Sequence, residues 1–172
     1  MDSILNPSNY SFNIYAVFPL IAGIFVLFLG FFVLSKKPGS IVNRSYFIFN
    51  LSIGIYQLGE GLQFSANDED VANRIFRYIS MSGATYVTIN GYFFSLAMLD
   101  KIKGRRRFVI AGYIFFSAAV FSMFFTDIII KGIHQTPWGY YGSAGRFAYI
   151  FIIPYIFYGL LVLKNFYYSY KA

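Results

Sequence analysis

The 172-residue chain has no cysteine, a single histidine and few charged residues. The absence of cysteine excludes a disulfide scaffold, a thiolate metal site and a cysteine nucleophile. A metal site usually needs several nitrogen, sulfur or oxygen ligands, so His134 alone predicts none, and no cofactor is expected. Asp, Glu, Lys and Arg make up 12% of the chain, which is about half the usual fraction in soluble domains.

Sequence motifs of enzymes are missing as well. The chain has no Walker-type glycine loop, no His-Glu-x-x-His motif, no convincing Ser/His/Asp set and no paired carboxylates at membrane depth. The acidic turn Asp68-Glu69-Asp70 lacks the spaced oxygen ligands of a calcium loop. We therefore expect no catalytic activity in this segment.

Apolar and aromatic residues are abundant instead. They reach 58% and 23% of the chain, more than a water-soluble domain of this length can bury. The formal charge of +7 comes from basic clusters between long uncharged runs. This spacing is typical of membrane proteins and not of a basic face that binds nucleic acid.

The uncharged runs predict an all-α, polytopic transmembrane bundle with five spans. The run Phe12–Leu34 has 23 residues without a charge, enough to cross a hydrocarbon core of about 30 Å. No repeat or linker divides the chain, so residues 1–172 are expected to form a single domain. The predicted spans are residues 12–34, 45–64, 75–99, 108–126 and 147–163.

Basic residues predict the orientation of these spans. Sorted by side, ten of the 14 fall on one side and four on the other. Since basic loops stay in the cytoplasm, we expect the N-terminus outside, the C-terminus inside and a multi-pass location in the inner (cytoplasmic) membrane. The ten are Lys36, Lys37, Arg44, Lys101, Lys103, Arg105, Arg106, Arg107, Lys164 and Lys171, and the four are Arg74, Arg77, Lys131 and Arg146.

Ionisable groups at membrane depth are candidates for function because they are costly there. Glu60 lies about one turn below the outer end of the second span, and Gln57 shares its helical face. Arg77 is expected at a similar depth in the third span, where it would pair with Glu60. Two interpretations stay open: an interfacial ion pair of Glu60 with Arg74 or Arg77 that fixes two helices, or a site that senses a ligand or a proton.

Two further regions carry polar or aromatic candidates. Asn90, in the third span, is expected either to join helices by a hydrogen bond or to line a cavity. The outer connection 131–142 contains His134, Trp138 and Tyr140, and Arg146 follows it. This connection suits an aromatic belt at the membrane surface or a lid over an outer pocket.

Three segments resemble the N-terminal seven-transmembrane sensor region of bacterial histidine kinases. Asn43–Leu62 (NRSYFIFNLSIGIYQLGEGL) looks like its second helix, and Ile75–Ala84 (IFRYISMSGA) is similar to the start of its third. The run PWGYYG at 137–142, followed by Gly145-Arg146-Phe147, resembles the connection before its fifth helix. The matching positions are Asn43, Arg44, Glu60, Arg77, Trp138, Gly139 and Tyr140.

The resemblance implies a sensory input domain that is coupled in relatives to a kinase, diguanylate cyclase or phosphatase. The chain departs from the family in two ways. Tyr56 stands where the family tends to have Trp, and only the first five of seven helices are present, as if helices six and seven and an output domain followed.

We therefore expect a membrane-embedded sensory domain of a bacterial two-component or related signalling protein. Its expected partners are the lipid bilayer, a small-molecule ligand, a cytoplasmic output domain in the same polypeptide and a second copy in a homodimer. Gln57, Glu60, Arg77, Asn90, His134, Trp138, Tyr140 and Arg146 are the candidate sensing residues. The rival interpretation is a small transporter or a partner subunit without an output domain.

Overall fold

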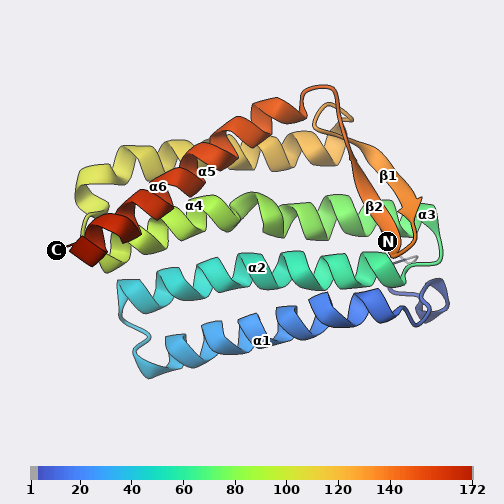
Figure 1. Ribbon diagram of the computed structural model, residues 1–172, viewed down its shortest axis with the longest axis horizontal. Coiled ribbons are helices and arrows are strands. Elements are labelled where there is room, and N and C mark those ends of the chain that lie inside the picture. Colours follow the sequence, from blue (N-terminus) through green and yellow to red (C-terminus); the bar gives the residue numbers. More distant parts are fainter. Residues whose placement is uncertain (1–3, 172) are drawn as a thin grey trace.

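The computed structural model describes residues 4–171, with side chains through residue 168. It is a bundle of long helices with one small hairpin at one end (Figure 1). The helices are η1 (Pro7–Asn9), α1 (Ile14–Lys36), α2 (Ile41–Ser65), α3 (Glu69–Ile75), the π-helix η2 (Phe76–Ser80), α4 (Met81–Met98), α5 (Ile102–Phe125) and α6 (Ala148–Lys171), and the strands are β1 (Ile130–Thr136) and β2 (Gly139–Ala144).

Short polar side chains set the starts of three helices. Asn13 accepts a hydrogen bond from the backbone N–H of Tyr15 at the start of α1. Ser40 caps α2 and Asp68 caps α3 in the same way. Each cap satisfies a backbone donor that the first helical turn leaves free.

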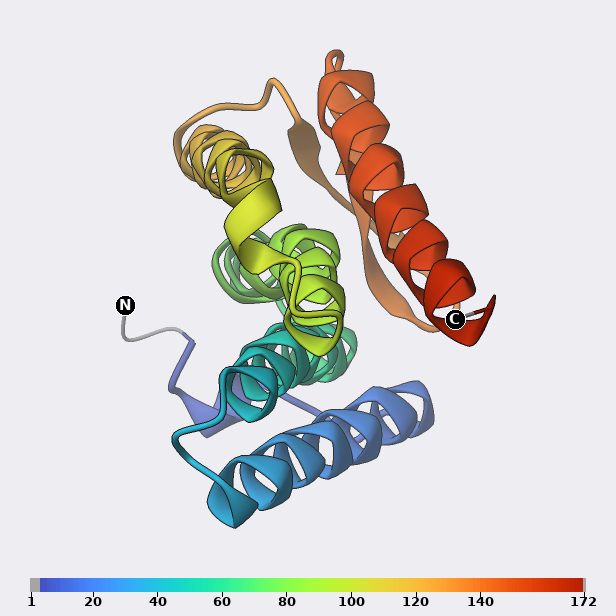
Figure 2. The ribbon, with the colours of Figure 1, turned by 90° about the vertical axis from the view of Figure 1, so that its left-hand side faces the viewer.

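The helices stack in layers, as the end-on view of Figure 2 shows. Helix α1 packs on α2, α2 packs on α4, and α4 in turn contacts both α5 and α6. Helices α2 and α4 therefore occupy the middle of the bundle. Helix α6 crosses α4 obliquely in Figure 1, so its two ends meet different neighbours.

All five predicted helical segments are confirmed as helices. Three of them, Ile14–Lys36, Ile102–Phe125 and Ala148–Tyr168, are long and apolar enough to cross a membrane, which is typical of a membrane protein. The central helices α2 and α4 are not among these three, and they carry buried polar residues such as Asn50, Gln63 and Asn90. Five spans thus stay a prediction.

The distribution of polarity is inverted relative to a soluble protein. Large apolar side chains point outward from the peripheral helices, for example Phe18 at 74%, Ile114 at 66% and Leu163 at 66% exposure. Buried polar side chains include Asn50 and Gln63 of α2. Such a surface suits contact with lipid chains rather than water.

Basic residues gather at the end of the bundle opposite the hairpin. The loops α1–α2 and α4–α5 and the C-terminal part of α6 all lie at this end (Figure 1). The ten residues assigned to one side lie in these loops, in the helix ends beside them and in the C-terminal part of α6. The side chain of Lys171 lies outside the described residues. We call this end the basic end and the other the hairpin end.

The connection between α5 and α6 is a β-hairpin, whereas only an interfacial loop was predicted from its residues. β1 and β2 pair antiparallel from Ile130↔Ala144 to Thr136↔Gly139, with an irregularity between Ile130 and Gly132. Gly139 adopts a φ of 130°, a conformation that glycine reaches without strain. The hairpin lies across the end of the bundle, running obliquely to the helix axes (Figures 1 and 2).

Glycine allows the backbones of α2 and α4 to approach closely. A Cβ atom at Gly83 would lie 2.7 Å from the carbonyl oxygen of Ser52 and against the backbone nitrogen of Tyr56. A Cβ atom at Gly59 would lie 2.8 Å from the backbone nitrogen of Ser80. Small residues at such contacts are what helix association in lipid requires.

Gly83→Ala is expected to lower the free energy of unfolding by about 1–3 kcal/mol, because backbone atoms of α2 cannot move aside as a side chain can. The measurement is thermal or denaturant unfolding of the detergent-solubilised chain. Gly159→Ala is the matched control in α6, since no atom lies within 4 Å of its added Cβ. Equal stability of the two variants would contradict the close α2–α4 contact.

Candidate functional site

A cleft of about 600 Å³ opens beside the hairpin, between α2 and α6, with α4 between these two helices. Its walls are mostly apolar and aromatic. They comprise Ile53, Tyr56, Gln57, Glu60 and Gln63 of α2, Phe76 of η2, Met81, Ala84 and Val87 of α4, Ile129, residues 130 and 141–144 of the hairpin, and Ala148, Phe151, Ile152 and Tyr155 of α6.

The polar groups of the cleft come from one face of α2. Gln57, Glu60 and Gln63 are spaced by three residues, so the helix places them on adjacent turns of the same side. The hydroxyl of Tyr56 donates a hydrogen bond to Oε1 of Glu60 at 3.0 Å. The cleft is therefore an apolar space with a single carboxylate group on one wall.

This carboxylate has no basic partner among the described residues. No Lys, Arg or His side chain lines the cleft, and the ion pair that the structure describes joins Arg77 to Asp127. The side-chain amide of Gln57 likewise makes no hydrogen bond within the described part of the chain. Both groups are free to bind a ligand.

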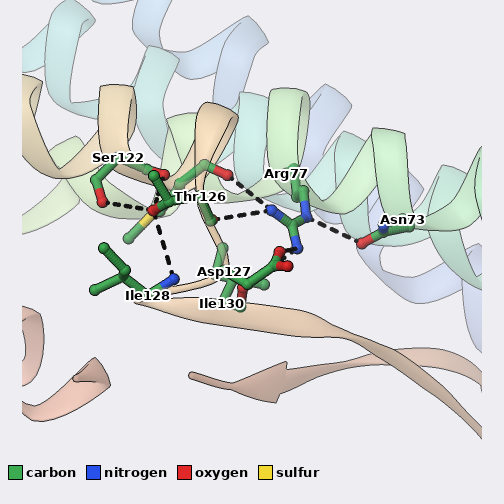
Figure 3. A network of polar contacts seen from close by, with 8 residues as sticks. Asn73, Arg77, Ser122, Thr126, Asp127, Ile128 and Ile130 are labelled. Carbon is green, nitrogen blue, oxygen red and sulfur yellow. Dashed lines mark hydrogen bonds and ion pairs between the residues drawn. The ribbon is translucent and has the colours of Figure 1, made fainter. Parts of the chain in front are cut away.

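The predicted pairing of Glu60 with Arg77 is wrong, since Arg77 is held elsewhere (Figure 3). Its guanidinium donates to several carbonyl oxygens at the end of α5 and the start of β1, and it pairs with a carboxylate in the loop between them. The partners are Met123 O, Thr126 O and Ile130 O at 3.2 Å each, Asn73 Oδ1 at 3.3 Å, and the Asp127 carboxylate.

Arg77 therefore acts as an anchor for the hairpin. The last carbonyl groups of α5 have no partner within the helix, and a cation near them is favourable. The Arg77 side chain is only 12% exposed, so its hydrogen bonds are shielded from water. Thr126 completes the turn: its Oγ1 donates to Ser122 O at 2.8 Å and accepts from the backbone nitrogen of Ile128 at 3.4 Å (Figure 3).

Two amide side chains hold the hairpin over the cleft. Nε2 of Gln63, a residue 1% exposed, donates to the carbonyl oxygen of Tyr140 at 2.8 Å. Nδ2 of Asn13 donates to Phe64 O at 2.7 Å and to Trp138 O at 2.9 Å. The sequence analysis missed both residues; the only signal for Gln63 was its place on the same helical face as Glu60.

The other predicted residues lie away from the cleft. Asn90 is buried between helices, where its Nδ2 donates to Ser52 Oγ at 2.6 Å and its Oδ1 accepts from the Tyr113 hydroxyl at 2.5 Å. It therefore joins α2, α4 and α5. This geometry favours the interhelical interpretation of Asn90.

Of the hairpin candidates, none contributes its side chain to the cleft. Nδ1 of His134 is 2.9 Å from Oγ of Ser143, a residue that lines the cleft, although His134 itself does not line it. Trp138 is 45% exposed at the turn, and Tyr140 packs toward α3. Arg146 lies over the ring of Phe147. Gln57 and Glu60 are thus the two predicted residues that the structure brings together, with Tyr141 as an unpredicted neighbour.

No protein-family model matches the chain, and neither a curated protein nor a solved structure is found to be similar to it. The chemistry of the cleft is therefore the basis for inferring a function.

Arg77→Lys is expected to loosen the hairpin, because an ammonium group cannot make the several directed hydrogen bonds of the guanidinium. Amide hydrogen exchange of residues 130–144 in the detergent-solubilised chain should become at least about tenfold faster, since losing buried charged hydrogen bonds costs more than 1.4 kcal/mol. Arg146→Lys is the control, with its side chain on the ring of Phe147. Unchanged exchange in Arg77→Lys would contradict the anchoring role.

Proposed function

We propose that the chain is the membrane-embedded input domain of a bacterial signalling protein and that the hairpin-end cleft receives the stimulus. The stimulus is an amphipathic molecule with a protonated amine and an apolar body. It reaches the cleft from the bilayer, its amine binds Glu60, and its apolar body lies between α2 and α6. The single observation that carries this proposal is a carboxylate without an ion-pair partner among the described residues, in a mostly apolar cleft.

Charge and shape both support a cationic amphiphile. A carboxylate in a low-dielectric environment attracts a cation strongly, and no basic side chain of the cleft competes for it. Gln57 offers a carbonyl acceptor next to the carboxylate. The apolar walls formed by Phe151, Ile152 and Tyr155 suit an alkyl or aromatic body.

The proposed topology has five spans, an external N-terminus and a cytoplasmic basic end. Each of the five helices runs between the hairpin end and the basic end (Figure 1), which supports five crossings. The basic residues at one end support a cytoplasmic location for that end in the inner membrane. The proposal places an output domain on the cytoplasmic side, in the same polypeptide.

Helix α6 is the proposed element that transmits the signal. Its N-terminal half lines the cleft through Phe151 and Tyr155. Its C-terminal half packs against α4 and α5 at the basic end, where the Tyr158 hydroxyl donates to Phe108 O at 2.8 Å. A ligand that binds one position of α6 better than another would shift the population toward that position.

Dodecylamine is a suitable test ligand, and the only tryptophan of the chain, Trp138, reports on the hairpin. In lipid nanodiscs, dodecylamine should change Trp138 emission saturably. Glu60→Gln should weaken this binding about tenfold or more, because it replaces a charged hydrogen bond by a neutral one. Dodecanol has the same chain length but no charge. It should bind wild type as weakly as dodecylamine binds Glu60→Gln.

Glu69→Gln is the matched control, since it removes one acidic charge at the same end of the bundle but outside this cleft. It should bind dodecylamine like wild type. Equal affinities of Glu60→Gln and Glu69→Gln, or equal binding of dodecanol and dodecylamine, would contradict the proposed site.

A further inference from the structure

A second, smaller groove lies at the basic end of the bundle, whereas the cleft lies at the hairpin end. It has a volume of about 230 Å³ and lies between the end of α4, the start of α5 and the C-terminal half of α6. Arg105 of α5 and Lys164 of α6 line it together with Tyr92 of α4, Phe157 and Leu161. It shares no lining residue with the hairpin-end cleft.

Both cations of the groove lack an acidic partner. Neither Arg105 nor Lys164 forms an ion pair with any residue that the structure describes. The guanidinium carbon of Arg105 lies 5.8 Å from the centre of the Phe108 ring, and Nζ of Lys164 lies 5.9 Å from that of Tyr168. Each ring makes a cation–π contact with its cation, and the N–H donors of Arg105 and Lys164 stay available for a ligand.

A tyrosine also lines this groove. Tyr92 is 3% exposed as a residue, and its hydroxyl makes no hydrogen bond with a described residue. Its neighbours are already bonded: Tyr158 donates to Phe108 O, and Asn165 Nδ2 donates to Ser95 Oγ at 2.8 Å. The Tyr92 hydroxyl can therefore donate to an acceptor that is bound in the groove.

The apolar wall of the groove continues onto the outer face of the bundle. Phe157 is 48% exposed, and Leu160 on the same helix is 58% exposed. These side chains lie on a helix apolar enough to cross a membrane. A molecule whose anionic group lies in the groove can therefore extend its hydrocarbon part along α6 in the bilayer.

We propose that this groove binds the headgroup of an anionic phospholipid such as phosphatidylglycerol. The phosphate lies between Arg105 and Lys164 and accepts a hydrogen bond from the Tyr92 hydroxyl. The acyl chains run along Phe157 and the outward face of α6. Basic pockets between membrane helices bind anionic headgroups by this chemistry, and an apolar wall beside the cations favours a lipid over free phosphate.

Native mass spectrometry of the full chain in detergent tests the site, with phosphatidylglycerol and phosphatidylcholine offered in equal amounts. Wild type should retain one phosphatidylglycerol molecule in preference to phosphatidylcholine. Arg105→Gln and Lys164→Gln should each lower the association constant of phosphatidylglycerol about fivefold, because each removes one basic charge beside an anionic lipid. Tyr92→Phe should lower it as well, without any change of charge.

Arg106→Gln is the matched control, because it removes the same charge from the next residue of α5, which does not line the groove. It should retain the lipid within twofold of wild type. Equal loss in Arg105→Gln and Arg106→Gln would overturn the proposal in favour of diffuse attraction to a basic surface. Displacement of the lipid by millimolar inorganic phosphate would overturn it in favour of a free-phosphate site. Circular dichroism of each variant verifies that the helices are intact.

Discussion

Close contact between the backbones of α2 and the η2–α4 helix is the constraint on which the rest of the structure depends. Lipid chains are as apolar as leucine, so helices in a bilayer are held by close packing and hydrogen bonds rather than by the hydrophobic effect. Gly59 and Gly83 permit that contact, and the Asn90–Ser52 hydrogen bond lies along it. Helix α2 is thereby fixed in the middle of the bundle. Part of its polar face makes buried contacts with neighbouring helices, and part lines the cleft, where Gln57 and Glu60 are half-buried.

The helices could be predicted from the sequence because lipid requires long uncharged runs, and such runs are visible without any tertiary information. The shared face of Gln57 and Glu60 was predictable from helical periodicity alone. The hairpin was not, since residues 130–144 lack a clear alternation of apolar and polar residues. The partner of Arg77 was not predicted because the position of a residue along its helix does not tell which neighbouring element its side chain meets. Asp127 lies beyond the end of α5, in the loop before β1.

Helix α6 connects the two proposed binding sites. Residues 148–155 form a wall of the hairpin-end cleft, and residues 157–165 form a wall of the groove at the basic end. Pro154 lies near the end of the first set, and it removes one backbone hydrogen bond from the helix interior. In the proposed arrangement an anionic lipid holds the C-terminal half of α6 in place. A ligand at the N-terminal half then tilts or shifts the helix relative to this held part. The two sites would then act on one element from opposite ends.

The central claim is that occupancy of the cleft changes the arrangement of helices at the basic end. The chain has no cysteine, so Ile41→Cys at the start of α2 and Leu163→Cys in α6 allow two spin labels to be placed at exposed positions of that end. Their distance distribution is measured by double electron–electron resonance in lipid nanodiscs, with and without saturating dodecylamine. The account predicts a shifted distribution that disappears when Glu60→Gln is added. An unchanged distribution, at a dodecylamine concentration that saturates the Trp138 signal, would contradict it.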